Sequence, residues 1–117
     1  MSYGKELILD IHDCDPKALN LGTVQKFMSA LCRAIDMEPV KLYYWEAHEH
    51  TEPDNVRGMS ACQFIRTSSV TIHTLDANCR VYLNIFSCKD FDNHDALRVT
   101  AFAFGGTLMQ MTEVIRD

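Results

Sequence analysis

Apolar and polar positions alternate near the start of the chain, and this pattern predicts a strand. In KELILDIHDC (5–14) every second side chain from Leu7 to Ile11 is apolar. Successive side chains of a strand point to opposite faces, so these residues share one face. Asp15 before Pro16 ends the segment, because proline favours a turn or the first position of a helix.

The next segment has the spacing of an amphipathic helix. Between residues 23 and 35, apolar side chains recur at intervals of three and four, which places them on one side of a helix. They are Val24, Phe27, Met28, Leu31 and Ile35. We expect Thr23 to cap this helix and Pro39 to stop it.

A second helix is predicted over residues 93–106, with Asn93 as its cap and Gly105-Gly106 as its end. The remaining segments are rich in β-branched and aromatic residues, which favours strands. These segments are 40–48, 60–66, 68–75, 79–87 and 107–117. The polar residues 48–58 are expected to form a loop.

The resulting order, β-α-β-β-β-β-α-β, predicts an α+β fold. We expect a two-layer sandwich in which two helices cover one face of a mostly antiparallel sheet. A length of 117 residues, 47% of them hydrophobic, is typical of one globular domain, which we assign to residues 1–117. The sequence contains no apolar run of the roughly 18 residues needed to cross a bilayer.

Charge and cysteine content narrow the class of protein further. The net charge is −5 and the basic residues are scattered, whereas a nucleic-acid-binding protein would show a basic stripe. The five cysteines form no CxxC pair, so we expect reduced thiols in a cytoplasmic protein without a metal site. The start, MSYGKELILD, lacks the bare apolar stretch of a signal peptide. The HEH at 48–50 is expected to be a solvent-exposed part of the loop.

Two neighbouring predicted strands each have one apolar face and one mixed face. The apolar faces consist of Val70, Ile72, Val81, Leu83 and Ile85. The mixed faces consist of Ser69, Thr71, His73, Tyr82, Asn84, Phe86 and Cys88. The apolar faces suit the helices, whereas a mixed face needs water, a partner subunit or a site. Periodicity alone leaves His73 and Cys88 open between structural and chemical roles.

Two stretches resemble the short, prokaryotic S-adenosylmethionine decarboxylases. They are GKELILDIHDCD (4–15) and GMSACQFIRTSSVTIHTLDANCRVYLNIFSC (58–88), and the order of elements agrees over nearly the whole chain. The resemblance implies a pyruvoyl-dependent lyase of polyamine (spermidine) biosynthesis that cleaves its own chain. Cleavage would follow Thr67, and Ser68 would become the pyruvoyl cofactor.

The resemblance also assigns roles to three further residues. His73 of TIHT and Ser60 of GMSA correspond to residues that assist self-processing, and Cys88 of FSC corresponds to the acid that returns a proton to the substrate. Each role suits its side chain, since an imidazole can remove a proton and a thiol can act as a general acid.

Several positions depart from the family pattern. Thr67 and Ser69 replace the glutamate and histidine that flank the cleavage serine, and Lys89 replaces the glycine after the cysteine. Leu75 and Ala77 stand where the family has a tryptophan that stacks on adenine and a glutamate that holds the ribose. Without these partners, binding of S-adenosylmethionine would lose roughly several kcal/mol.

For the family's second stacking aromatic, Tyr44 and Trp45 are the available substitutes. Three hypotheses follow for the whole protein. The first is a decarboxylase of this family whose small-molecule substrate has changed to an amino acid such as ornithine or arginine. The second is an uncleaved, non-catalytic homologue that acts as a structural or regulatory dimer partner, and the third is an unrelated α+β binding module. The resemblance further implies a homodimer in which the mixed faces meet as four αββα layers.

Overall fold

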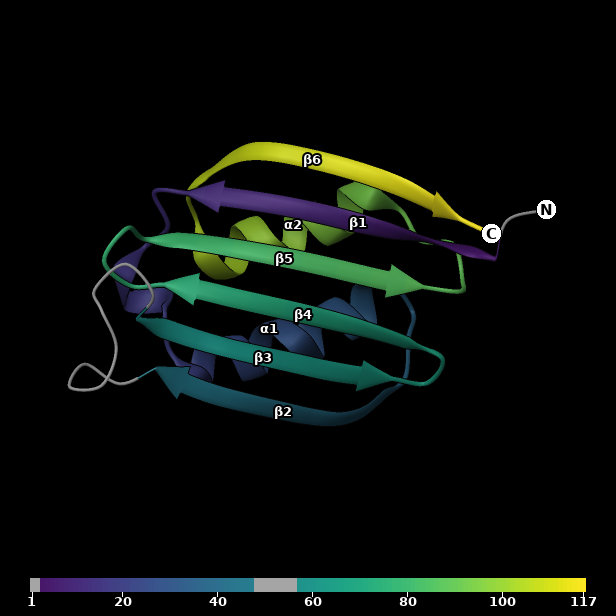
Figure 1. Ribbon diagram of the computed structural model, residues 1–117, viewed down its shortest axis with the longest axis horizontal. Helices are drawn as coiled ribbons and strands as arrows, with labels where there is room; N and C mark the ends of the chain where they lie inside the picture. Colours follow the sequence, from purple (N-terminus) through teal and green to yellow (C-terminus); the bar gives the residue numbers. More distant parts are fainter. Residues whose placement is uncertain (1–2, 48–56) are drawn as a thin grey trace.

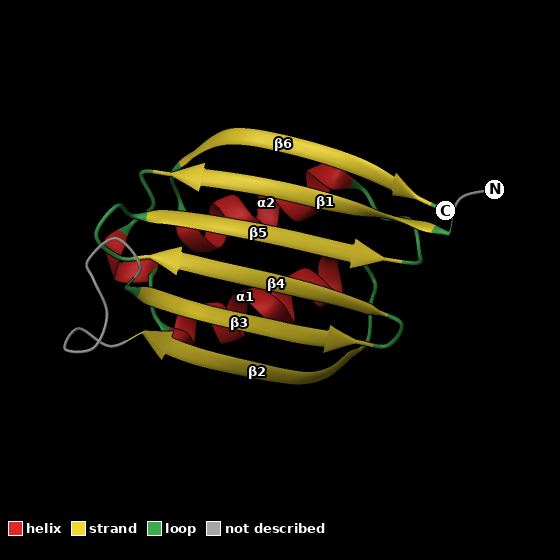
Figure 2. Cartoon of the chain, viewed as in Figure 1, coloured by secondary structure: helices red, strands yellow, loops and turns green. Residues whose placement is uncertain are grey.

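The chain folds into one six-stranded antiparallel sheet with two helices on one face, as the sequence predicts (Figures 1 and 2). The computed structural model describes residues 3–47 and 57–117, so nearly all of the predicted loop, including HEH, lies outside the described residues. The elements are β1 (Gly4–His12), a 3-10 helix (Pro16–Ala18), α1 (Leu21–Ala34), β2 (Pro39–Ala47), β3 (Gly58–Ile65), β4 (Ser68–Leu75), β5 (Arg80–Ser87), α2 (Asn93–Phe104) and β6 (Thr107–Arg116). The strand order across the sheet is β2-β3-β4-β5-β1-β6.

The core lies between the sheet and the two helices. Alternate residues of the four central strands are buried against α1 and α2, because the period of two directs them to the same side. Leu7, Ile72 and Leu83 are fully buried there. The rings of Phe27 and Phe104 lie 5.1 Å apart and join the two helices. The predicted apolar and mixed faces are therefore correct, with the mixed face open on the side opposite the helices.

Both helix starts differ from the prediction by a short distance. α1 begins at Leu21, where Asn20 caps it by accepting a hydrogen bond from the Thr23 backbone N–H. α2 is capped by Asp92, because Asn93 uses its side chain to bind Lys5 instead. Thr23 and Asn93 are therefore not the caps.

Two other predicted boundaries hold, whereas α1 ends at Ala34, before Pro39, which instead begins β2. Asp15 caps the 3-10 helix that starts at Pro16, and its side chain accepts from the Lys17 N–H. Gly105 ends α2 with a φ of 66°, a left-handed conformation that glycine adopts without strain. No helix among the described residues is long and apolar enough to cross a membrane.

Candidate functional site

The residues singled out by the sequence lie at two ends of the central strand β4. Ser68 begins the strand and His73 stands near its far end. Five steps of extended chain place their backbones about 16 Å apart. Their side chains also point to opposite faces of the sheet. Ser68 shares the face of the buried Val70 and Ile72, whereas His73 is exposed on the open face. Within the single chain, no described hollow is lined by both side chains.

The Ser68 end contains a connected group of hydroxyl and thiol side chains. Ser68 pairs with Ser87 of β5 across the sheet, and its hydroxyl donates to the Ser87 hydroxyl over 3.3 Å. Ser87 is fully buried and held in turn by Lys89, whose backbone N–H donates to its oxygen at 2.9 Å. The Cys88 sulfur lies 3.0 Å from the Thr67 hydroxyl. Ser68 and Cys88 are therefore connected through their neighbours, Ser68 through its pair with Ser87 and Cys88 through the Thr67 hydroxyl.

Thr67 has an unusual backbone conformation at the predicted cleavage point. Its φ is 65°, in the left-handed region that β-branched residues rarely adopt. Holding such a residue there costs about 1–3 kcal/mol, and this kind of strain is common where a chain performs chemistry. The peptide bond between Thr67 and Ser68 therefore follows a strained residue at the tight β3–β4 turn. The sequence carries no signal of this strain, because threonine is not a residue typical of the left-handed region.

A close approach of β1 shapes the same end. A Cβ added to Gly4 would lie 2.0 Å from the Ser87 carbonyl oxygen and 2.7 Å from the Cys88 Cα. Only glycine lets the backbone pass here. The neighbouring Lys5 is buried, and its ammonium group lies 3.2 Å from Asp90. The lysine holds the pKa of the Asp90 carboxyl below its usual range through a hydrogen bond and its charge.

Two hollows flank the Ser68 end. One, of about 200 Å³, is lined by Asp36, Met37, Glu38, Arg66, Thr67, Ser68 and Lys89. The other, of about 420 Å³, is lined by Tyr3, Gly4, Lys5, Cys88, Asp90 and Ile115. The hydrogen bond between Thr67 and Cys88 links residues of the two walls. In the smaller hollow, Lys89 pairs with Asp36 at 2.9 Å and lowers the pKa of its carboxyl.

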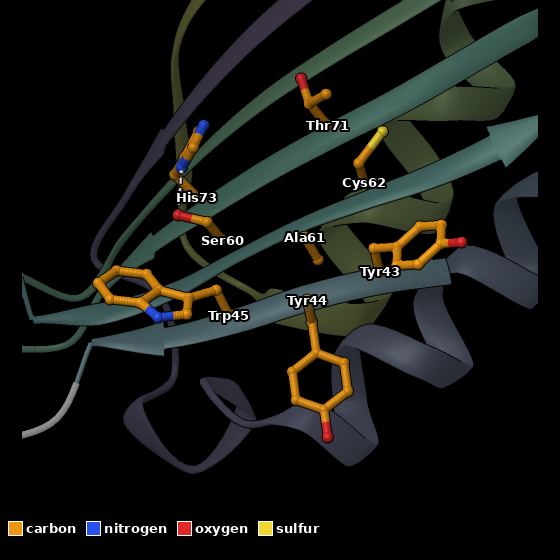
Figure 3. Close-up of a pocket in the computed structure, with 8 residues that line it drawn as sticks. All are labelled: Tyr43, Tyr44, Trp45, Ser60, Ala61, Cys62, Thr71 and His73. Atoms are coloured by element: carbon orange, nitrogen blue, oxygen red, sulfur yellow. Dashed lines mark hydrogen bonds between the residues drawn. The ribbon is translucent and has the colours of Figure 1, made fainter. Parts of the chain in front are cut away.

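The His73 end has a different character, with aromatic rings around one polar pair. Ser60 of β3 pairs with His73 across the sheet, and its hydroxyl lies 2.8 Å from the imidazole Nδ1. The pair lines a hollow of about 320 Å³, and Figure 3 shows the residues around it. Trp45 lies beside Ser60 on the open face, whereas Tyr44 points away from it. Of the two aromatic substitutes, Trp45 is therefore the one that reaches this hollow from the open face.

Leu75 and Ala77, which the resemblance aligns with the family's adenosine-binding positions, also lie near this end. Leu75 ends β4 and Ala77 is exposed in the β4–β5 turn. Next to them, burial raises the pKa of the Asp76 carboxyl. The residues described by the structure contain no cluster of three or more metal-ligating side chains.

Comparisons with known proteins agree with this architecture. A profile of the family described as S-adenosylmethionine decarboxylase matches residues 5–117. The fold is similar to the crystal structure of the adenosylmethionine decarboxylase from Aquifex aeolicus VF5, with a TM-score of 0.71 and 10% sequence identity. That match covers 98% of this chain and 89% of the other chain. A search of curated proteins gave no significant match.

Proposed function

Because the chain belongs to the S-adenosylmethionine decarboxylase family, we propose that it is a self-processing, pyruvoyl-dependent carboxy-lyase. One observation carries the proposal. Ser68, which would become the cofactor, directly follows the left-handed Thr67 and shares its surroundings with the Cys88 thiol. A hydroxyl, a strained peptide bond and a thiol therefore occur together at one end of β4.

Self-processing uses groups that are adjacent along the chain. The Ser68 hydroxyl attacks the Thr67 carbonyl carbon, so that the peptide bond becomes an ester and the Ser68 nitrogen becomes an amine. Loss of the Ser68 Cα proton then expels the Thr67 carboxylate as a new C-terminus. The remaining dehydroalanine takes up water and releases ammonia, which leaves a pyruvoyl group at the new N-terminus. Relief of the left-handed Thr67 conformation favours the first step.

The pyruvoyl group supplies the electron sink for loss of carbon dioxide. The residues around position 68 suit this group. The smaller hollow adjoins Ser68, and Cys88 directly follows Ser87, the residue that pairs with Ser68 across the sheet. Cys88 then returns a proton to the product as a general acid. The Thr67 hydroxyl, 3.0 Å from the sulfur, holds the thiol in place before cleavage.

The substrate that best fits the Ser68 end is a small basic amino acid such as ornithine or arginine. The hollow of about 200 Å³ is lined by two ion pairs, Arg66–Glu38 and Lys89–Asp36, which a substrate with both a carboxylate and a side-chain cation would exchange for pairs with itself. None of its lining residues is aromatic, so it offers no ring for adenine to stack on.

Ser60 and His73 take part in processing through a second copy of the chain. Within one chain the backbones of His73 and Ser68 are about 16 Å apart along the strand and their side chains point to opposite faces, so direct proton transfer between them is out of reach. A homodimer that joins the open faces as αββα layers would place further side chains near the cleavage point. The exposed aromatic residues of that face, including Trp45 and Phe64, support such burial.

Intact-mass spectrometry of the purified protein tests the proposal. We expect one fragment that ends at Thr67 and a second that begins at position 68. The Ser68→Ala variant should remain one species of 13.4 kDa. Release of carbon dioxide from ornithine, arginine and S-adenosylmethionine then identifies the substrate. A wild-type chain that stays whole after prolonged incubation would exclude the pyruvoyl mechanism.

A second candidate is an uncleaved homologue that acts as a structural or regulatory dimer partner. The observation that favours it is the separation of His73 from Ser68 on opposite faces of β4. If the chain stays whole, mixing it with an active relative and measuring that enzyme's rate distinguishes a regulator from an inert domain.

A further inference from the structure

The helical layer is basic although the protein is acidic. α1 and α2 together carry three basic residues, Lys26, Arg33 and Arg98, and one acidic residue, Asp95, whereas the chain has a net charge of −5. Arg98 is paired with Asp95 on the same helix. Lys26 and Arg33 have no ion-pair partner among residues 3–47 and 57–117. Within the described part of this acidic chain, Lys26 and Arg33 therefore mark the helical face as two cations without an ion pair.

These two cations border a groove between the helices. The groove has a volume of about 420 Å³ and is lined by Thr23, Lys26, Phe27, Ala30, Arg33, Val99, Phe102 and Ala103. The small side chains of Ala30 and Ala103 let another backbone approach closely. The groove belongs to the helical layer, on the opposite side of the sheet from the open face (Figure 1).

Phe102 is the most exposed large apolar side chain among the described residues, at 94% of its full accessibility. Burial of a whole phenylalanine is worth about 1.5–3 kcal/mol, so leaving it in water at the edge of a groove is costly. An exposed aromatic residue beside cations and an apolar floor is the usual composition of a protein-binding hot spot.

The charge spacing selects the kind of occupant. Lys26 and Arg33 are seven residues apart, which is two helical turns, or about 10 Å, along one side of α1. A helix laid in the groove with acidic residues seven apart would pair with both. A second copy of this chain would instead bring the same cations towards each other, since a two-fold contact joins identical patches. Like charges in such a contact are unfavourable.

We propose that the α1–α2 groove binds an amphipathic, acidic helix of another protein. Apolar side chains of that helix cover Phe102 and the groove floor, and its carboxylates pair with Lys26 and Arg33. The site is independent of the proposed decarboxylase activity, because none of its residues lines the hollows at either end of β4.

Fluorescence anisotropy with a labelled helical peptide tests the proposal. The probe is about 14 residues, or four turns, with leucines on one face and glutamates seven apart beside them. A matched peptide has lysine in place of each glutamate. We expect the acidic peptide to bind the full-length protein at least ten-fold more tightly than the basic one. Its affinity should fall as the salt concentration is raised.

Variants of the groove sharpen the result. Phe102→Ala should lower the affinity for the acidic peptide about ten-fold. It should not lower the melting temperature of the protein, because the ring is exposed. Lys26→Glu with Arg33→Glu should reverse the preference in favour of the basic peptide. Phe64→Ala, an exposed phenylalanine on the open face, is the matched control and should leave the affinity for both peptides unchanged.

Three outcomes would overturn the proposal. The first is equal or absent binding of the two peptides, and the second is an unchanged preference after charge reversal. The third is self-association that Phe102→Ala abolishes, because it would make a second copy the occupant.

Discussion

The two ends of β4 differ in chemistry although one strand connects them. The Ser68 end gathers reactive groups, namely two serine hydroxyls, a thiol and a strained peptide bond. The His73 end gathers groups that bind, with an aromatic wall around a serine–imidazole pair. Residues close in sequence therefore need not act together, because side chains an odd number of residues apart on a strand point to opposite faces of the sheet.

The largest expected effect comes from combining variants of the two ends. Ser68→Ala should abolish cleavage, and His73→Ala should slow it by about 10²–10⁴-fold, the usual value of a proton-transfer group. If His73 acts across a dimer, mixing the two variants should restore cleavage of the His73→Ala chain, as measured by intact mass. If mixing restores nothing, His73 does not act on Ser68 from a second copy.

A smaller effect is expected from Ser87, which no sequence feature had singled out. Its buried hydroxyl accepts the Ser68 hydrogen bond, so Ser87→Ala should slow cleavage about ten-fold by releasing the nucleophile. It should also destabilise the fold by about 1–3 kcal/mol in a urea titration, because Lys89 loses a buried partner.

Ser87→Thr keeps the hydroxyl and should restore most of the rate. Ser69→Ala, a neighbour in β4, is the control for the general effect of losing a serine. A Ser87→Ala chain that is cleaved at the wild-type rate would contradict the positioning role.

A fall in pH should destabilise the Ser68 end of β4 and stabilise the His73 end. The carboxyls of Asp36 and Asp90 have lowered pKa values through Lys89 and Lys5, so their stabilising contribution is present above their unfolded pKa and is lost as the pH falls through the folded value. Asp76, at the His73 end, has a raised pKa through burial, so protonation there stabilises the fold as the pH falls.

Amide hydrogen exchange at pH 7 and near pH 4, corrected for intrinsic rates, measures this contrast. Protection should fall first around the Ser68 end and persist around the β4–β5 turn. Equal loss at both ends would show that these carboxyls do not control local stability.

The smallest expected effect is optical. Trp45 is the single tryptophan of the chain and is 59% exposed on the open face. If the open faces meet in a homodimer, its emission should shift to the red when the protein is diluted and the dimer dissociates. A spectrum that is independent of concentration, together with a monomer in light scattering, would contradict that arrangement.

Much of the architecture could be predicted from local patterns. Alternation gave the strand faces, the helical spacing placed Val24, Phe27 and Leu31 in the core, and Gly105 ended α2. Helix caps were less predictable, since Asn20 and Asp92 compete with neighbouring polar residues for the same role. The choice of cap depends on which side chain has another partner, as Asn93 has in Lys5.

The order of elements, the two faces of the sheet and the family of the chain follow from its amino-acid sequence. Which of these residues meet depends on how the strands pack in the folded chain. Strand register joins Ser68 to Ser87 and Ser60 to His73, and it keeps the two pairs apart. The physical reason is that periodicity acts over a few residues, whereas register and backbone strain are set by the packing of strands far apart in the chain.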